Sequence, residues 1–86
     1  MIRMFQNNIV ATVTTITTRG SVCYALEARE RKNNKEKVWE LKLPWVKEPK
    51  HAIALLNDLP SDFHPKTNFQ FGFSYVGTDL IPPDLI

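Results

Sequence analysis

The stretch that decides the fold reads Asn68-Phe69-Gln70-Phe71-Gly72-Phe73-Ser74-Tyr75-Val76. Side chains along a β-strand point alternately to opposite sides, so the four aromatic rings would share one face. Burying each ring is worth roughly 1.5 to 3 kcal/mol, and a chain of 86 residues has few other large side chains for its core. We therefore predict a strand whose aromatic face, made by Phe69, Phe71, Phe73 and Tyr75, packs under a helix.

The triplet Phe71-Gly72-Phe73 resembles the centre of the RNA-recognition-motif signature, in which aromatic residues on an open sheet stack on bases. That signature has a basic residue and Gly before its first aromatic residue and another aromatic residue at its end. This chain has Phe69 and Gln70 before the triplet and Val76 at the end, and its pattern contains one helix too few. We therefore prefer the packed core as the interpretation of these rings.

Three strands are predicted before the aromatic stretch. Residues Ile9–Thr18 are almost all β-branched, which favours a pleated strand over a helix. Gly20 supplies the positive φ of a tight reversal into a second strand, over Val22–Arg29. Residues 31–37 contain no apolar side chain and form the predicted exposed hairpin loop, and the third strand, Val38–Leu43, ends at a proline.

An amphipathic helix is predicted over Pro49–Leu59. Proline suits the first position of a helix, and the apolar residues Ala52, Ile53, Leu55, Leu56 and Leu59 gather on one face at helical spacing. Pro60 ends the helix because its ring clashes with the preceding turn and it has no N–H to donate.

These elements predict a single α+β domain over residues 1–78, in the order β-β-β-α-β, with the helix on one face of an antiparallel meander. A right-handed crossover would bring the last strand into the sheet parallel to the third. The sequence does not indicate which strand it would pair with. The Thr-rich first strand or the third strand would then form an exposed edge that could pair with another copy as a homodimer. Residues 79–86, with Pro82-Pro83, are predicted to form an extended tail.

The charges are unevenly distributed along the chain. The net charge is +2, but residues 29–50 hold eight of the eleven Lys and Arg residues against four acids, and the part from His51 onward has a charge of −3. The composition, with 43% hydrophobic and 23% charged residues, is that of a globular protein. We expect a cytoplasmic protein, because the first residues lack the apolar run of a secretory signal and no segment reaches the length of a membrane span.

No set of residues suggests catalysis or a cofactor. Cys23 is the only cysteine and has no activating neighbour, while His51 and His64 lack companions at metal-ligand spacing and read as surface residues. Asp58 and Asp62 flank the end of the helix with nothing to position a substrate. We therefore expect a protein that is not an enzyme and needs neither metal nor cofactor.

Three hypotheses about function follow. The preferred one is an accessory or regulatory protein that binds another protein through a strand edge, the basic hairpin loop or the apolar tail. The second is nucleic-acid binding through the basic hairpin at residues 29–37, and the third is a self-associating structural subunit. The candidate contact residues are Arg29, Arg31, Lys32, Lys35, Lys37, Leu80, Ile81, Leu85 and Ile86.

Overall fold

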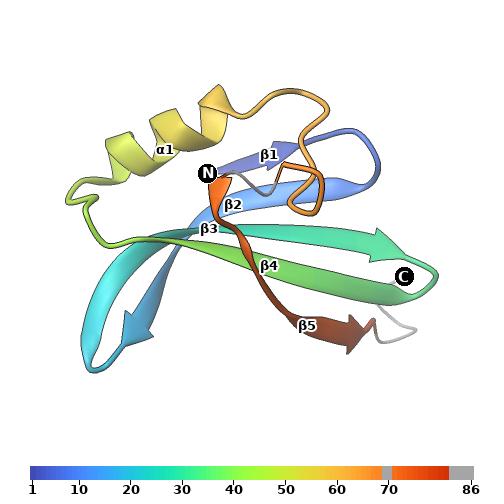
Figure 1. Cartoon of the computed structure of the whole chain (residues 1–86), viewed down its shortest axis with the longest axis horizontal. Helices are drawn as coiled ribbons and strands as arrows, with labels where there is room; N and C mark the ends of the chain where they lie inside the picture. The colour runs from blue at the N-terminus through green and yellow to red at the C-terminus, as the bar shows by residue number, and fades with distance from the viewer. Residues whose placement is uncertain (69–70, 82–86) are drawn as a thin grey trace.

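The computed structural model describes residues 1–68 and 71–81, which form a five-stranded sheet with one helix over it (Figure 1). The sheet follows chain order, and each strand is antiparallel to its neighbours. The predicted α+β class is confirmed. The elements are β1 (Ile2–Met4), β2 (Ile9–Thr18), β3 (Ser21–Lys32), β4 (Lys35–Leu43), α1 (Pro49–Asp58) and β5 (Ser74–Leu80).

The sheet differs from the prediction at both of its edges. Strand β1 was not predicted, and it pairs with Val10, Ala11 and Thr12 near the start of β2. The Thr-rich residues 14–18 of β2 pair with β3 alone, so this half of the strand lies at the edge of the sheet, as expected. Strand β5 pairs antiparallel with β4, so the predicted parallel crossover is wrong. Helix α1 runs back along the sheet, opposite to β4, and the connection after it then turns back toward the start of the helix before β5 begins (Figure 1). Strand β5 therefore also runs opposite to β4. The edges of this sheet are therefore β1 together with the second half of β2 on one side, and β5 on the other.

The aromatic stretch does not form the buried row that its alternation predicts. Strand β5 begins only at Ser74, after Gly72 with a φ of +88°, a conformation that breaks an extended strand. Phe71 is 39% exposed and Tyr75 is 56% exposed, so their predicted burial is wrong. Phe73 is half-buried, and Phe69 lies outside the described residues.

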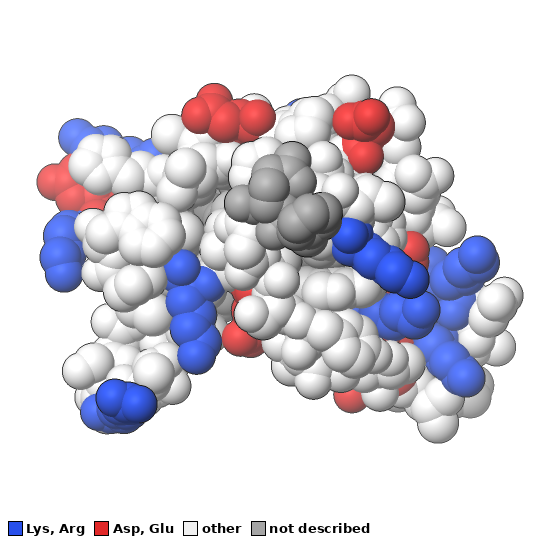
Figure 2. All heavy atoms as spheres, in the orientation of Figure 1, with Lys and Arg blue, Asp and Glu red and all other residues white. Residues whose placement is uncertain are grey.

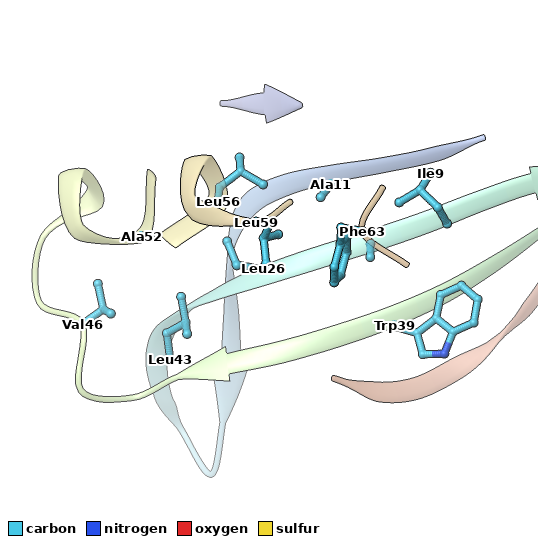
Figure 3. Close-up of a cluster of buried hydrophobic side chains, with 11 residues drawn as sticks. Ile9, Ala11, Leu26, Trp39, Leu43, Val46, Ala52, Leu56, Leu59 and Phe63 are labelled. Atoms are coloured by element: carbon cyan, nitrogen blue, oxygen red, sulfur yellow. The ribbon is translucent and has the colours of Figure 1, made fainter. Parts of the chain in front are cut away.

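The ring at the centre of the core is instead Phe63, which comes from the loop after α1 and is fully buried. Figure 3 shows it over the sheet, between the helix and Trp39. Its ring packs against Phe5 at 5.3 Å and Phe73 at 5.2 Å between centroids. Apart from Trp39, the other buried members of the cluster are aliphatic and join the helix to the inner strands: Ile9, Ala11, Leu26, Ala28, Leu43, Val46, Ala52, Leu56 and Leu59.

Helix α1 agrees with its predicted bounds to within one residue, and it packs over β2 and β3 rather than over an aromatic row. Ala52, Leu56 and Leu59 are buried as the helical spacing predicts, whereas Leu55 is 37% exposed. The last turn of the helix contains no basic residue of its own. Arg3, from β1, supplies that charge, because its Nη1 lies 3.0, 2.9 and 2.7 Å from the carbonyl oxygens of Leu56, Asn57 and Leu59.

The predicted seven-residue loop between the second and third strands is wrong. Strand β3 continues to Lys32 and β4 starts at Lys35, so only Asn33 and Asn34 form the turn. Both have positive φ, 56° and 61°, which is the backbone of a type I′ hairpin turn. Asparagine tolerates this conformation better than most residues do. The charged residues on either side are therefore strand residues, and they alternate between the two faces of the sheet.

The other long hairpin forms as predicted, with Arg19 and Gly20 as its two turn residues. Gly20 has a φ of +81°, and a Cβ added there would meet nothing within 4 Å. We therefore expect Gly20→Ala to destabilise the fold by about 1 to 2 kcal/mol through backbone strain alone, measured by urea unfolding. Gly77→Ala is the matched control, because Gly77 also has open space around it but no positive φ. An equal cost for the two variants would contradict this turn.

The end of β5 reaches into the segment expected to form a tail. Asp79 and Leu80 belong to the strand, and the Ile81 N–H donates to the Asn34 carbonyl at 3.0 Å. Residues 82–86, including the candidate contacts Leu85 and Ile86, lie outside the described residues. Within residues 1–68 and 71–81, no helix has the length and apolar character needed to cross a membrane.

Candidate functional site

The hairpin of β3 and β4 separates the basic run of the sequence into two sets. Lys32 lies opposite Lys35, and Lys37 lies opposite Glu30. These pairs alternate along the hairpin with the same parity as the buried pair Ala28 and Trp39. These residues therefore point to the side of the sheet that carries α1. Arg29 and Arg31 have the other parity and point to the opposite side. The five cations predicted as one surface thus occupy two.

The two arginines are neutralised by acids on their own face. Arg29 donates from Nε to Glu27 at 2.6 Å and from Nη1 to Glu36 at 2.8 Å, and Arg31 lies 3.5 Å from Glu36. The hydrogen bond to Glu27 contributes most to raising the pKa of the Arg29 guanidinium above its ordinary value, and the charge of Glu36 adds to it. The Arg29 charge is therefore permanent, and it is satisfied within the protein.

The lysines are arranged differently. Lys32, Lys35 and Lys37 are exposed, and Lys66 joins them from the loop between α1 and β5. We call these four residues the lysine face. None of them makes an ion pair within the part of the chain that the structure describes. Figure 2 shows basic side chains gathered at the end of the molecule where the β3–β4 hairpin lies.

Two adjoining hollows lie along the lysine face, and they share Lys37. One has a volume of about 340 Å³ and is lined by residues of the hairpin, namely Glu30, Lys32, Asn33, Lys35 and Lys37. The other has a volume of about 320 Å³ and is lined by Lys37, Trp39, Lys66 and Tyr75. The two linings therefore contain four lysines and a single acid. The lysine face is cationic at one end and has aromatic walls at the other.

His64 fixes the loop that carries Lys66. The backbone N–H of Lys66 donates to the His64 Nδ1 at 3.0 Å, so the ring proton lies on Nε2 in this arrangement, which faces Glu30 Oε2 at 3.0 Å. The His64 side chain is 15% exposed, and its ring packs edge-to-face with Trp39 at 5.5 Å. The expectation of a surface histidine is therefore wrong. The bond to Glu30 also occupies the one carboxylate that lines these two hollows.

Trp39 and Tyr75 form the aromatic end of the lysine face. A register shift in the β4–β5 pairing places Tyr75 directly opposite Trp39, and the ring centroids lie 5.6 Å apart at 61°. Trp39 is 7% exposed, whereas Tyr75 is 56% exposed. The Tyr75 hydroxyl hydrogen-bonds the side chain of Thr78, two positions past the shift on the same strand. The Tyr75 ring is therefore held at two points and still open to solvent.

The remaining candidate residues do not join this surface. Cys23 is half-buried and lies opposite Ile16 on the far face of the sheet. Asp58 and Asp62 are exposed near the end of α1. Among the described residues, no three His, Cys, Asp or Glu side chains come together closely enough to hold a metal ion. Leu80 is 78% exposed and lies opposite Lys35, at the border of the lysine face.

Sequence reasoning identified Lys32, Lys35 and Lys37 but missed Lys66, Trp39 and Tyr75 as members of one surface. Lys66 is brought there by a contact between residues 34 positions apart, Glu30 and His64, which no local pattern reveals. Comparison with protein-family models, with curated proteins and with solved structures finds no match to this chain.

Proposed function

We propose that the protein is a nucleic-acid-binding module without catalytic activity, which holds backbone phosphates on the lysine face. The observation that supports this most strongly is the sorting of charge by the hairpin. On one side of the sheet, Arg29 and Arg31 form ion pairs with Glu27 and Glu36. On the other side, the four residues of the lysine face form no ion pair among the described residues. Ammonium groups that are free of internal partners are available to bind phosphate oxygens, and counterions released from the nucleic acid favour the complex.

Protein binding through a strand edge is the second proposal. Strand β5 is a seven-residue edge, and its exposed apolar side chains include Val76 (56%) and Leu80 (78%). An extended segment of a partner, or a second copy of the chain, would find unpaired backbone groups there. The edge does not account for the four lysines that lie beside it, whereas nucleic-acid binding does.

The lysine face is tested by removing its charge. We expect the wild-type chain to bind a labelled oligonucleotide with an affinity that falls as salt rises, by a slope of about 0.7 log unit per phosphate contacted on a single strand. With three or four contacts the slope is roughly −2 to −3. Changing all four lysines to Gln should weaken binding at low salt by at least about tenfold and flatten the slope. Fluorescence anisotropy over a salt series measures both quantities.

The matched control removes four positive charges from exposed positions elsewhere, so that both variants have the same net charge. Its substitutions are Arg19→Asn, Lys42→Gln, Lys47→Gln and Lys50→Gln. We expect it to retain binding within about threefold, because distant charges contribute only through a screened field. Equal losses in the two variants would show that net charge, and not the lysine face, drives binding. Full binding by the variant of the lysine face would disprove the proposal.

A further inference from the structure

Tyr75 differs from an ordinary exposed side chain because its ring is held in place. Its ring has Trp39 beside it and Thr78 at its hydroxyl, so it is oriented, yet more than half of its surface faces solvent. An unrestrained surface tyrosine would lose rotamer freedom whenever a ligand packed on it, whereas a ring already held in place loses much less. The structure thus presents a preorganised aromatic surface at the end of a cationic face.

The hollow in front of this ring combines two kinds of wall. Trp39 and Tyr75 provide aromatic surface, and Lys37 and Lys66 provide positive charge on the same hollow of about 320 Å³. That volume lies at the lower end of the range of roughly 300 to 1,000 Å³ that is typical of small-molecule sites. A flat ring with a phosphate on either side matches this lining, because the ring stacks on Tyr75 while its phosphates approach the two ammonium groups.

We propose that the ligand of the lysine face is single-stranded nucleic acid, with one unpaired base stacked on Tyr75 between Lys37 and Lys66. This rests on the proposed function and narrows it. In a duplex the faces of the bases are covered by their neighbours, so Tyr75 could touch only the backbone and its ring would add little. In a single strand each base has a face to offer, which makes stacking independent of sequence.

The same lysines continue the path of the strand away from the base. Lys35 and Lys37 are two positions apart on β4, which places them about 7 Å apart along the strand. Lys32 faces Lys35 across the turn of Asn33 and Asn34. A flexible single strand can adjust its phosphates to this spacing. An acidic peptide would satisfy the lysines equally well, but its carboxylates offer nothing that stacks on Tyr75.

Fluorescence anisotropy with a single-stranded 12-mer and a hairpin duplex of the same base composition tests this inference. We expect the single strand to bind more tightly than the duplex. Tyr75→Leu should weaken single-strand binding by roughly 5- to 150-fold, because it keeps an apolar contact with Trp39 but removes the stacking ring. Tyr75→Phe should stay within about threefold of the wild type, because it keeps the ring. Duplex binding should be unchanged in both variants.

Photo-crosslinking provides a readout on the unmodified protein. A 5-bromouracil oligonucleotide should crosslink within residues 67–86, which trypsin leaves in one peptide because this segment contains no Lys or Arg. A crosslink confined to other peptides would overturn the base site.

The outcomes separate this inference from the proposed function. Equal single-strand and duplex affinities, insensitive to Tyr75→Leu but lost with the four lysines, would overturn the base site and leave phosphate binding intact. Full binding without the lysines would overturn both. Displacement of the oligonucleotide by polyglutamate of matched charge, with equal competition in the wild type and in Tyr75→Leu, would favour an acidic peptide and overturn the single-strand assignment.

Discussion

Phe63→Ala is expected to remove about 3 to 5 kcal/mol from the free energy of unfolding, which is the usual cost of deleting a fully buried aromatic ring. Phe63 is fully buried, and its ring contacts Phe5, Phe71 and Phe73 at centroid distances of 5.3, 6.1 and 5.2 Å. Small domains are stable by only about 5 to 15 kcal/mol in total, so this variant should be partly unfolded near its working temperature. Urea unfolding followed by far-UV circular dichroism measures the loss.

Phe71→Ala is the matched control, because it also removes a phenyl ring from the cluster around Phe63. Phe71 is 39% exposed and touches the group through Phe63 alone among the ring pairs of the described residues. We expect it to cost no more than about 1.5 kcal/mol. A larger loss for Phe71→Ala than for Phe63→Ala would restore the buried row predicted from the alternation and contradict the central place of Phe63.

Arg3→Ala is expected to cost about 2 to 3 kcal/mol, because it leaves carbonyl oxygens at the end of α1 without a charged donor. The guanidinium also lies 4.5 Å from the centre of the Phe5 ring, where a cation adds about 0.5 to 1 kcal/mol. Arg3→Lys should recover about half of the loss, because it keeps the charge near the helix end but not the planar set of donors. Thermal and urea unfolding of the three proteins give the comparison.

Lys50→Ala is the control for charge, since it also removes one cation, here from the first turn of α1. Its ion pair with Glu48 at 3.2 Å is largely exposed, and it lies at the start of the helix, where positive charge is unfavourable. We expect a change within about 0.5 kcal/mol. If Arg3→Ala changed stability no more than Lys50→Ala does, the bridge from β1 to the helix would not be an important part of the fold.

The regular part of the fold could be predicted because its signals are local. The β-branched run in β2, the alternation in β3 and β4 and the apolar spacing in α1 each identify an element within ten residues or so. Strand β1 has only three residues, and Arg3 ties it to helix carbonyls more than 50 positions away. A local sequence pattern cannot predict a contact between residues so far apart in the chain.

The failure of the aromatic prediction has a physical cause. Alternation shows which rings would share a face if the backbone stayed extended, but Gly72 departs from that conformation. The fully buried ring is Phe63, and it comes from a loop that has no periodic pattern. Which ring fills the core is determined by how the side chains pack in three dimensions.

The lysine face could have been predicted in part. Asparagine tolerates positive φ better than most residues, so Asn33 and Asn34 could have been identified as a two-residue turn. With that turn in place, the parity of Lys32, Lys35 and Lys37 follows. The position of Lys66 and the exposure of Tyr75 depend on the loop pinned by His64. They follow only from the folded structure.

The sorting of charge by the β3–β4 hairpin also makes the sheet an electric dipole along its normal. The side opposite the lysine face carries four acids, Glu27, Glu36, Glu40 and Asp79, against Arg29, Arg31 and Lys42. A polyanion that comes within the Debye length, about 10 Å at 0.1 M salt, would exert a torque that turns the lysines toward it before contact. A molecule of net charge +2 can thus orient itself in an encounter, and added salt would remove this advantage first from the association rate.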